Sequence, residues 1–97
     1  MPGKFLRITE VVKICGVDED FVIRLEQEKV IYPVIRRNRK LYPLDQVDRV
    51  RVARLLIEEM GVNLEGAEVA LHMRDQMIAM QRQFNELLRL LGRELKR

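Results

Sequence analysis

The last third of the chain carries a helical pattern that a small globular head cannot bury. From residue 64 onward there is no proline, and apolar residues recur at alternating intervals of three and four. The positions in this pattern are Ala70, Met73, Met77, Met80, Phe84, Leu87 and Leu91. Such spacing, sustained over three heptads, is typical of a helix in a coiled coil.

The length of this helix indicates that its far end needs a partner. At about 1.5 Å per residue it would extend roughly 45 Å, further than a head of about 60 residues can cover. We therefore expect a homodimer held together by these apolar side chains. The alternative is a terminal helix folded back on its own head, which would leave residues 84–91 exposed. The predicted dimer seam consists of Met73, Met77, Met80, Phe84, Leu87 and Leu91.

The residues before this helix begin with two short helices. Thr9 is a candidate N-cap for a helix over residues 10–15, and Gly16 follows where a left-handed residue ends a helix. Asp18 is a candidate N-cap for a second helix that runs to Lys29, with acidic residues in its first turn. Two short helices separated by so tight a turn predict a helix-turn-helix.

A hairpin and a third helix follow. Residues 30–35 and 40–42 are rich in β-branched and aromatic side chains, so the basic residues between them are expected to form the tip of a small wing. Pro43 then permits a helix over residues 44–60, and Asn63 caps the long last helix. We thus expect an all-α fold with a small β wing.

This pattern divides the chain into a winged helix-turn-helix head over residues 5–62 and a dimerisation helix over residues 63–97. One cysteine and one histidine exclude an internal disulfide and a Cys/His zinc set. The sequence shows no phosphate-binding glycine loop and no catalytic triad or carboxylate pair. No signal peptide or membrane span is visible either. We expect a cytoplasmic, non-enzymatic protein without metal or cofactor.

The charge is concentrated in one turn. The net charge of +3 resides entirely in residues 1–43, because residues 44–97 are neutral. Cations on an exposed turn can hold DNA phosphates, which dominate affinity for double-stranded DNA. The alternative is a solvated turn that only favours solubility. The candidate phosphate-binding residues are Arg36, Arg37, Arg39 and Lys40.

The second helix has the opposite character, with a net charge of −3 over residues 18–29. Base readout in the major groove depends mostly on Arg, Lys, Asn and Gln, so an acidic helix reads a groove poorly. Helix capping accounts for the acids at its start but not for those further along. A protein partner with a basic surface would suit them. The candidate partner-binding residues are Asp18, Glu19, Asp20, Glu26 and Glu28.

The order of elements resembles the MerR family over Phe5 to about Leu91. Residues 8–11 resemble the opening helix of that family, and residues 25–26 resemble the end of its recognition helix. Residues 30–33 are similar to the turn into the wing, and residues 40–42 to its basic and aromatic close. The resemblance implies a dimer that forms through an antiparallel coiled coil of the last helices.

Residues 61–66 are similar to a signature shared by two heat-shock branches of this family. One branch comprises MerR-type heat-shock repressors, and the other comprises chaperone modulators of the CbpM type, which bind a J-domain co-chaperone. Residues 66–69, which lead into the Met-rich helix, bring the chain closer to the modulators.

The chain also differs from the DNA-binding members. Those members carry an Arg and two aromatics at the positions of Ile23, Arg24 and Leu25. They have a glycine at the position of Lys29, and a capping serine at that of Pro43. The first expectation is therefore a chaperone modulator that binds and inhibits a J-domain co-chaperone. The second is a DNA-binding transcriptional regulator of the heat-shock repressor type, and the third is a purely structural oligomerisation module.

Overall fold

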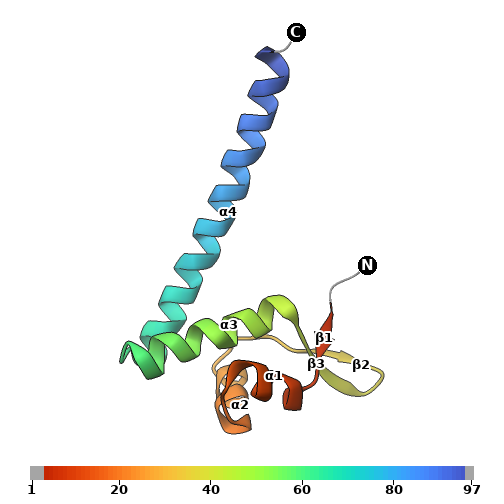
Figure 1. Cartoon of the computed structure of the whole chain (residues 1–97), viewed down its shortest axis with the longest axis vertical. Helices are drawn as coiled ribbons and strands as arrows, with labels where there is room; N and C mark the ends of the chain where they lie inside the picture. The colour runs from red at the N-terminus through yellow and green to blue at the C-terminus, as the bar shows by residue number, and fades with distance from the viewer. Residues whose placement is uncertain (1–3, 96–97) are drawn as a thin grey trace.

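The computed structural model describes residues 4–95, which form a small head and one long helix (Figure 1). The fold is mostly helical with a three-stranded antiparallel sheet, as the sequence predicted. Residues 96–97 of the expected dimerisation helix lie outside the described part. The elements in chain order are β1 (Phe5–Leu6), α1 (Ile8–Cys15), α2 (Glu19–Gln27), β2 (Val34–Arg36), β3 (Arg39–Pro43), α3 (Leu44–Arg54), the π-helical turn η1 (Leu55–Glu59) and α4 (Leu64–Leu95).

The start of α1 corrects one prediction. Thr9 does not cap this helix, because it already lies in the first turn. The N-cap is Arg7, whose backbone N–H donates to Glu10 Oε1 at 2.9 Å. Phe5 and Leu6 pair with β3, so the chain leaves the sheet and enters the helix earlier than the local sequence suggested. No cross-strand partner could be read from so short a strand, and β1 was not predicted.

The start of α2 confirms its predicted cap. Asp18 Oδ1 accepts the backbone N–H of Phe21 at 2.9 Å, which satisfies one of the free donors of the first turn. Gly16 joins the two helices with φ of 68°, a left-handed conformation that glycine adopts at little cost. The predicted helix-turn-helix is thus present.

The wing is narrower than the sequence suggested. Strand β2 begins only at Val34, whereas Val30 and Ile31 are buried in the core instead of the hairpin. Arg36 pairs with Arg39, so the turn consists of Arg37 and Asn38 alone. Their φ angles of 53° and 62° make a two-residue turn of the type that matches the twist of paired strands.

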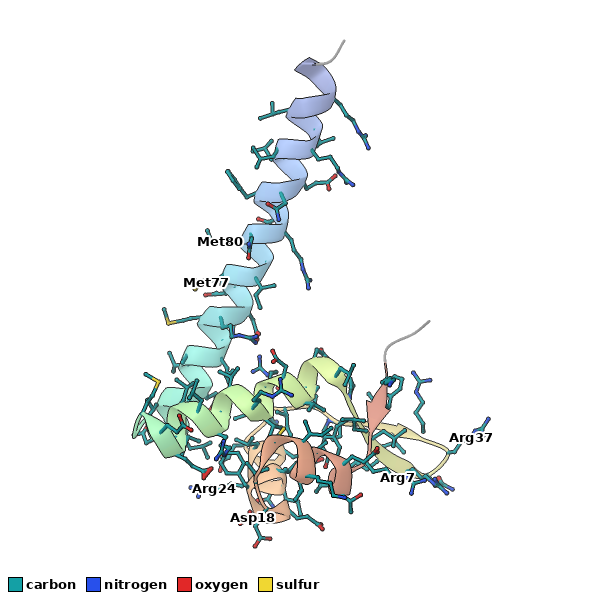
Figure 2. The ribbon with its side chains drawn as sticks, in the orientation of Figure 1. Arg7, Asp18, Arg24, Arg37, Met77 and Met80 are labelled. Carbon is teal, nitrogen blue, oxygen red and sulfur yellow. The ribbon has the colours of Figure 1, made fainter. Side chains whose placement is uncertain are left out.

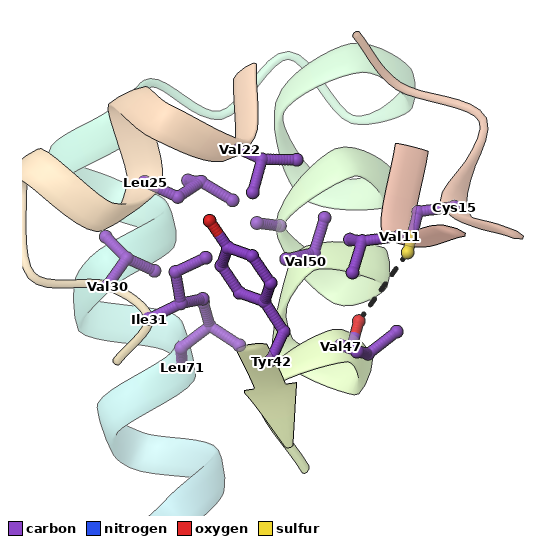
Figure 3. Packing of buried hydrophobic residues seen from close by; sticks show 11 residues of the cluster. Val11, Cys15, Val22, Leu25, Val30, Ile31, Tyr42, Val47, Val50 and Leu71 are labelled. Atoms are coloured by element: carbon purple, nitrogen blue, oxygen red, sulfur yellow. Dashed lines mark hydrogen bonds between the residues drawn. The ribbon is translucent and has the colours of Figure 1, made fainter. Parts of the chain in front are cut away.

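Tyr42 of β3 lies at the centre of the head (Figure 3). It is fully buried, together with Val22 and Leu25 of α2 and Val50 of α3. Cys15 lies at the edge of this core, where its thiol donates to the Val47 carbonyl oxygen at 3.7 Å. Burial raises the pKa of that thiol, as expected for a small core residue.

The third helix does not run evenly to Met60. After Arg54 it widens into η1, in which the Met60 N–H bonds to the Leu55 carbonyl oxygen at 3.1 Å. An i to i+5 turn shifts the later side chains by one residue. Met60, the last residue of the helix that the sequence predicted over residues 44–60, is 64% exposed.

Helix α4 begins where the sequence predicted. Asn63 Oδ1 accepts the Gly66 N–H at 2.7 Å, which confirms the cap. Ala67 and Leu71 are fully buried, and Leu71 belongs to the core of the head. Beyond them the helix leaves the head and extends alone, so the chain does not fold back on itself (Figure 1). The molecule is therefore elongated, measuring 56 × 36 × 20 Å.

Candidate nucleic-acid interface

The tip of the wing presents Arg37 to solvent (Figure 2). Both residues of the two-residue turn, Arg37 and Asn38, are exposed. Within the described residues, Arg37 and Arg39 take part in no ion pair. Both guanidinium groups are thus available to clamp phosphate oxygens in two-point contacts.

A shallow hollow lies beside the wing, where β3 passes the start of α1. Its volume is about 360 Å³, and its only charged lining residues are three cations, Arg7, Arg39 and Lys40. Ile8 and Thr9, in the first turn of α1, complete the lining. The hollow combines positive charge with an open mouth, which suits a phosphate group of a DNA backbone. Arg7 was not among the predicted residues, because only the pairing of β1 with β3 brings it there.

The other two wing cations are already engaged. The Arg36 guanidinium carbon lies 4.7 Å from the centre of the Phe5 ring, in a cation–π contact that holds β1 to the wing. Lys40 Nζ lies 2.8 Å from Glu26 Oε2. The four candidate cations therefore divide into two sets: Arg37 and Arg39 take part in no ion pair among the described residues, whereas Arg36 contacts Phe5 and Lys40 contacts Glu26.

The five candidate acids are likewise not equivalent. Asp18 is occupied as the α2 cap, and Glu26 turns toward the wing, with only 17% of its side chain exposed. Glu19, Asp20 and Glu28 remain exposed. Asp18 lies on the lower side of the head, away from the wing tip (Figure 2), whereas Glu26 contacts Lys40 of the wing, so the structure does not gather the five acids into one patch.

Glu26 also contacts the core. Tyr42 Oη donates to Glu26 Oε1 at 3.4 Å. Burial and, next, the negative charge of Glu26 raise the pKa of Tyr42 to about 12, so its phenol stays neutral and keeps donating. Sequence reasoning assigned Glu26 to a partner surface and Lys40 to phosphate, yet the fold pairs them with each other.

Lys29 and Pro43, two positions that differ from the DNA-binding pattern, are less favourable for local stability than the residues they replace. Lys29 follows α2 with φ of 60°, a conformation that glycine adopts freely and lysine does not. Pro43 occupies the N-cap position of α3 and provides no side-chain hydrogen bond there. Lys29 thus adopts a strained backbone conformation, and α3 begins without a side-chain cap.

The predicted seam on α4 is uncovered in a single chain. Its side chains are 49–68% exposed, and Met77 and Met80 project away from the head (Figure 2). A contiguous exposed apolar stripe of this length is typical of a protein–protein contact. The exposed seam residues are Met73, Met77, Met80, Phe84, Leu87 and Leu91.

Two ion pairs set the direction in which α4 leaves the head. Arg74 Nη2 lies 2.6 Å from Asp48 Oδ2. Arg49 Nη1 lies 2.6 Å from Asp75 Oδ2. Arg49 also donates through Nε to the Val30 carbonyl oxygen at 2.8 Å, so one side chain joins α3, α4 and the loop before the wing. The first turns of α4 are thereby fixed to the head.

Residues 4–95 contain neither a membrane-spanning helix nor a cluster of metal-ligating side chains. No helix there is long and apolar enough to cross a membrane. In that same range, no group of three or more His, Cys, Asp or Glu side chains is arranged to hold a metal ion.

Comparison with known proteins identifies the family. No curated protein sequence matches the chain. A family model described as "MerR HTH family regulatory protein" matches residues 6–89. That family is non-enzymatic, and membership in it implies DNA binding and dimerisation. Because the match extends from β1 through most of α4, the chain belongs to the MerR helix-turn-helix regulatory family.

Proposed function

We propose that this chain is a homodimeric transcriptional regulator whose wing holds the phosphates of double-stranded DNA. The supporting observation is the basic hollow formed by Arg7, Arg39 and Lys40, together with the unpaired Arg37 at the wing tip. Arg7 and Arg37 lie at the same end of the head (Figure 2), so one DNA strand can contact both. The signature in residues 61–66, shared by heat-shock repressors and chaperone modulators, supports a role in heat-shock regulation.

In this proposal the seam on α4 pairs two chains in antiparallel fashion and gives each dimer two heads. Each head would meet one half-site, and phosphate contacts by the wing would fix its orientation. The acidic surface of α2 leaves Arg24 and Gln27 as its exposed side chains suited to base contacts. We therefore expect phosphate contacts to carry more of the affinity than base contacts do.

The test is a titration of the full chain with DNA from upstream of its own gene, followed by fluorescence anisotropy over a range of salt. Arg37→Asn is the sharpest variant, because asparagine accepts a positive φ and keeps the turn folded. Arg37→Asn and Arg39→Gln should each weaken binding and make the salt dependence shallower by about one phosphate contact. Arg82→Gln, an exposed position on α4, is the matched control and should leave binding unchanged. If neither wing variant differs from the control, the wing does not hold DNA.

A second candidate function is chaperone modulation, in which the chain binds and inhibits a J-domain co-chaperone. It is favoured by the exposed acids Glu19, Asp20 and Glu28 on and beside α2, since J-domains in general present a basic helix. None of these three acids lines the basic hollow. One dimer can therefore offer DNA and a protein partner different faces.

Calorimetry with an isolated J-domain distinguishes the two functions. Reversing the charge at Glu19 and Glu28 together should abolish J-domain binding and leave the DNA titration unaffected. The same reversal at Glu65, an exposed acid on α4, provides the control. Wild-type protein that releases no heat with the J-domain would exclude this second function, and a pull-down that offers both ligands would show whether they compete.

A further inference from the structure

One carboxylate joins the helix-turn-helix to the wing. Glu26 accepts from Lys40 Nζ at 2.8 Å through one oxygen and from Tyr42 Oη at 3.4 Å through the other. Both partners belong to β3, and the residues are 14 and 16 positions away in sequence. The carboxylate is therefore held from two directions at the point where α2 meets the hairpin.

Tyr42, Glu26 and Lys40 are buried to different extents, and this determines which of them can move. Tyr42 is fully buried, and the side chain of Glu26 is 17% exposed, so the carboxylate is rigidly placed. Lys40 differs, because 48% of its side chain remains exposed and it also lines the basic hollow. The pair thus has one fixed partner and one that can turn toward solvent.

The contact has an electrostatic consequence for the hollow. With Glu26 beside it, the charge of Lys40 is largely cancelled at the distance of a bound phosphate. Arg7 and Arg39 then supply most of the attraction. Because attraction to phosphate does not depend on sequence, each added cation strengthens binding to any DNA.

We propose that Glu26 is a positioning residue that sets the wing against α2 and withholds the charge of Lys40 from phosphate. The chain thereby limits its affinity for arbitrary DNA and binds best where the helix-turn-helix and the wing both fit. This inference rests on the proposed DNA-binding function. It assigns to the α2–wing junction a role in discrimination between sites.

Glu26→Gln is the variant that isolates the charge, because glutamine keeps an oxygen that can accept from Tyr42. The full chain is titrated with two duplexes of equal length, the upstream DNA and a scrambled sequence, over a range of salt. We expect Glu26→Gln to steepen the salt dependence by about one phosphate contact. Affinity for the scrambled duplex should rise severalfold, and the ratio between the two duplexes should fall.

Lys40→Ala and the double variant complete the cycle. Lys40→Ala leaves the Glu26 charge uncompensated, so its salt dependence should be shallower than that of the wild type. The double variant should return to the wild-type slope, because the cancelling charges are both gone. If instead Lys40 contacts phosphate directly, the double variant stays shallower than the wild type and the inference is overturned. Circular dichroism confirms that each variant is folded.

Tyr42→Phe separates geometry from charge. It removes the second hydrogen bond but leaves both charges, so its slope should match the wild type. An unchanged slope in Glu26→Gln overturns the inference while DNA binding by the wing stands. If Arg37→Asn and Arg39→Gln also leave binding unchanged, the proposed DNA-binding function fails, and this inference fails with it.

Discussion

The head and the distal part of α4 differ in how far a single chain buries their apolar side chains. In the head, residues from α1, α2, β3 and α3 bury one another around Tyr42, so a single chain completes that core. In α4 beyond Leu71, every large apolar side chain of the seam is about half exposed or more. The core of the head is therefore complete within one chain, whereas in the dimer that we propose the stability of the distal helix would depend on protein concentration.

Of the substitutions proposed here, charged residues in the seam should change the stability of the dimer most. Met80→Glu together with Phe84→Glu would place charges in a buried interface at a cost of several kcal/mol. Sedimentation should show a monomer, while circular dichroism of the head stays native. Ala79→Glu, an exposed position outside the seam pattern, is the matched control. A dimer that survives the double substitution would place the interface elsewhere.

Leu71→Ala tests where the part of α4 that packs in the head ends and the exposed part begins. Leu71 is fully buried in the core of the head, and a leucine-to-alanine truncation costs about 2–5 kcal/mol. Chemical unfolding should show this loss at every protein concentration, unlike the effect of the seam variants. The same truncation at Leu91, which is 49% exposed in one chain, should instead weaken the dimer. Equal and concentration-dependent losses at both positions would contradict the division.

The pH dependence of unfolding tests the centre of the head. Tyr42 has its pKa raised to about 12 in the folded chain, against about 10 when unfolded. Its contribution is therefore complete below pH 10 and is lost as the pH rises toward 12. We expect a decline of about 2 kcal/mol in the free energy of unfolding over that range. Tyr42→Phe should not show this decline, and parallel curves for the two proteins would refute the assignment.

The smallest expected effect is a gain. Lys29 has φ of 60°, so Lys29→Gly should relieve backbone strain and stabilise the head by roughly 1 kcal/mol. Lys29→Ala removes the same side chain without relieving the strain and should give no such gain. Thermal melts of both variants measure the difference. If alanine stabilises as much as glycine, the effect comes from the side chain and not from the backbone.

Local signals in the sequence were reliable where one segment determines its own structure. The caps at Asp18 and Asn63, the left-handed Gly16 and the hairpin tip all depend on neighbouring residues, and all are present. The seam was recognisable because its spacing is periodic over many residues. Its exposure in the single chain agrees with that pattern.

Features that depend on distant residues were not predictable in this way. Strand β1 has two residues and exists through its pairing with β3, which also displaces the cap from Thr9 to Arg7. The π-helical turn η1 adds a residue to one turn of the helix, and a pattern that assumes even α-helical spacing does not reveal it. The pairing of Glu26 with Lys40 joins two residues that sequence reasoning had assigned to different ligands. Charge counts locate ions along a chain but do not show which of them neutralise each other.

In the dimer that we propose, the two ion pairs at the base of α4 would make the length of that helix set the distance between the two heads. Arg74 with Asp48 and Arg49 with Asp75 fix each head to the first turns of its own helix. In a dimer joined by the distal seam, the rotation of one head relative to the other about the helix axis would depend on helix length. The relevant length is the number of residues between these ion pairs and the seam. One inserted residue would turn a head by about 100° around the helix axis, whereas a whole heptad would nearly restore its facing and move it about 10 Å. Helix length would thus select the half-site spacing on DNA.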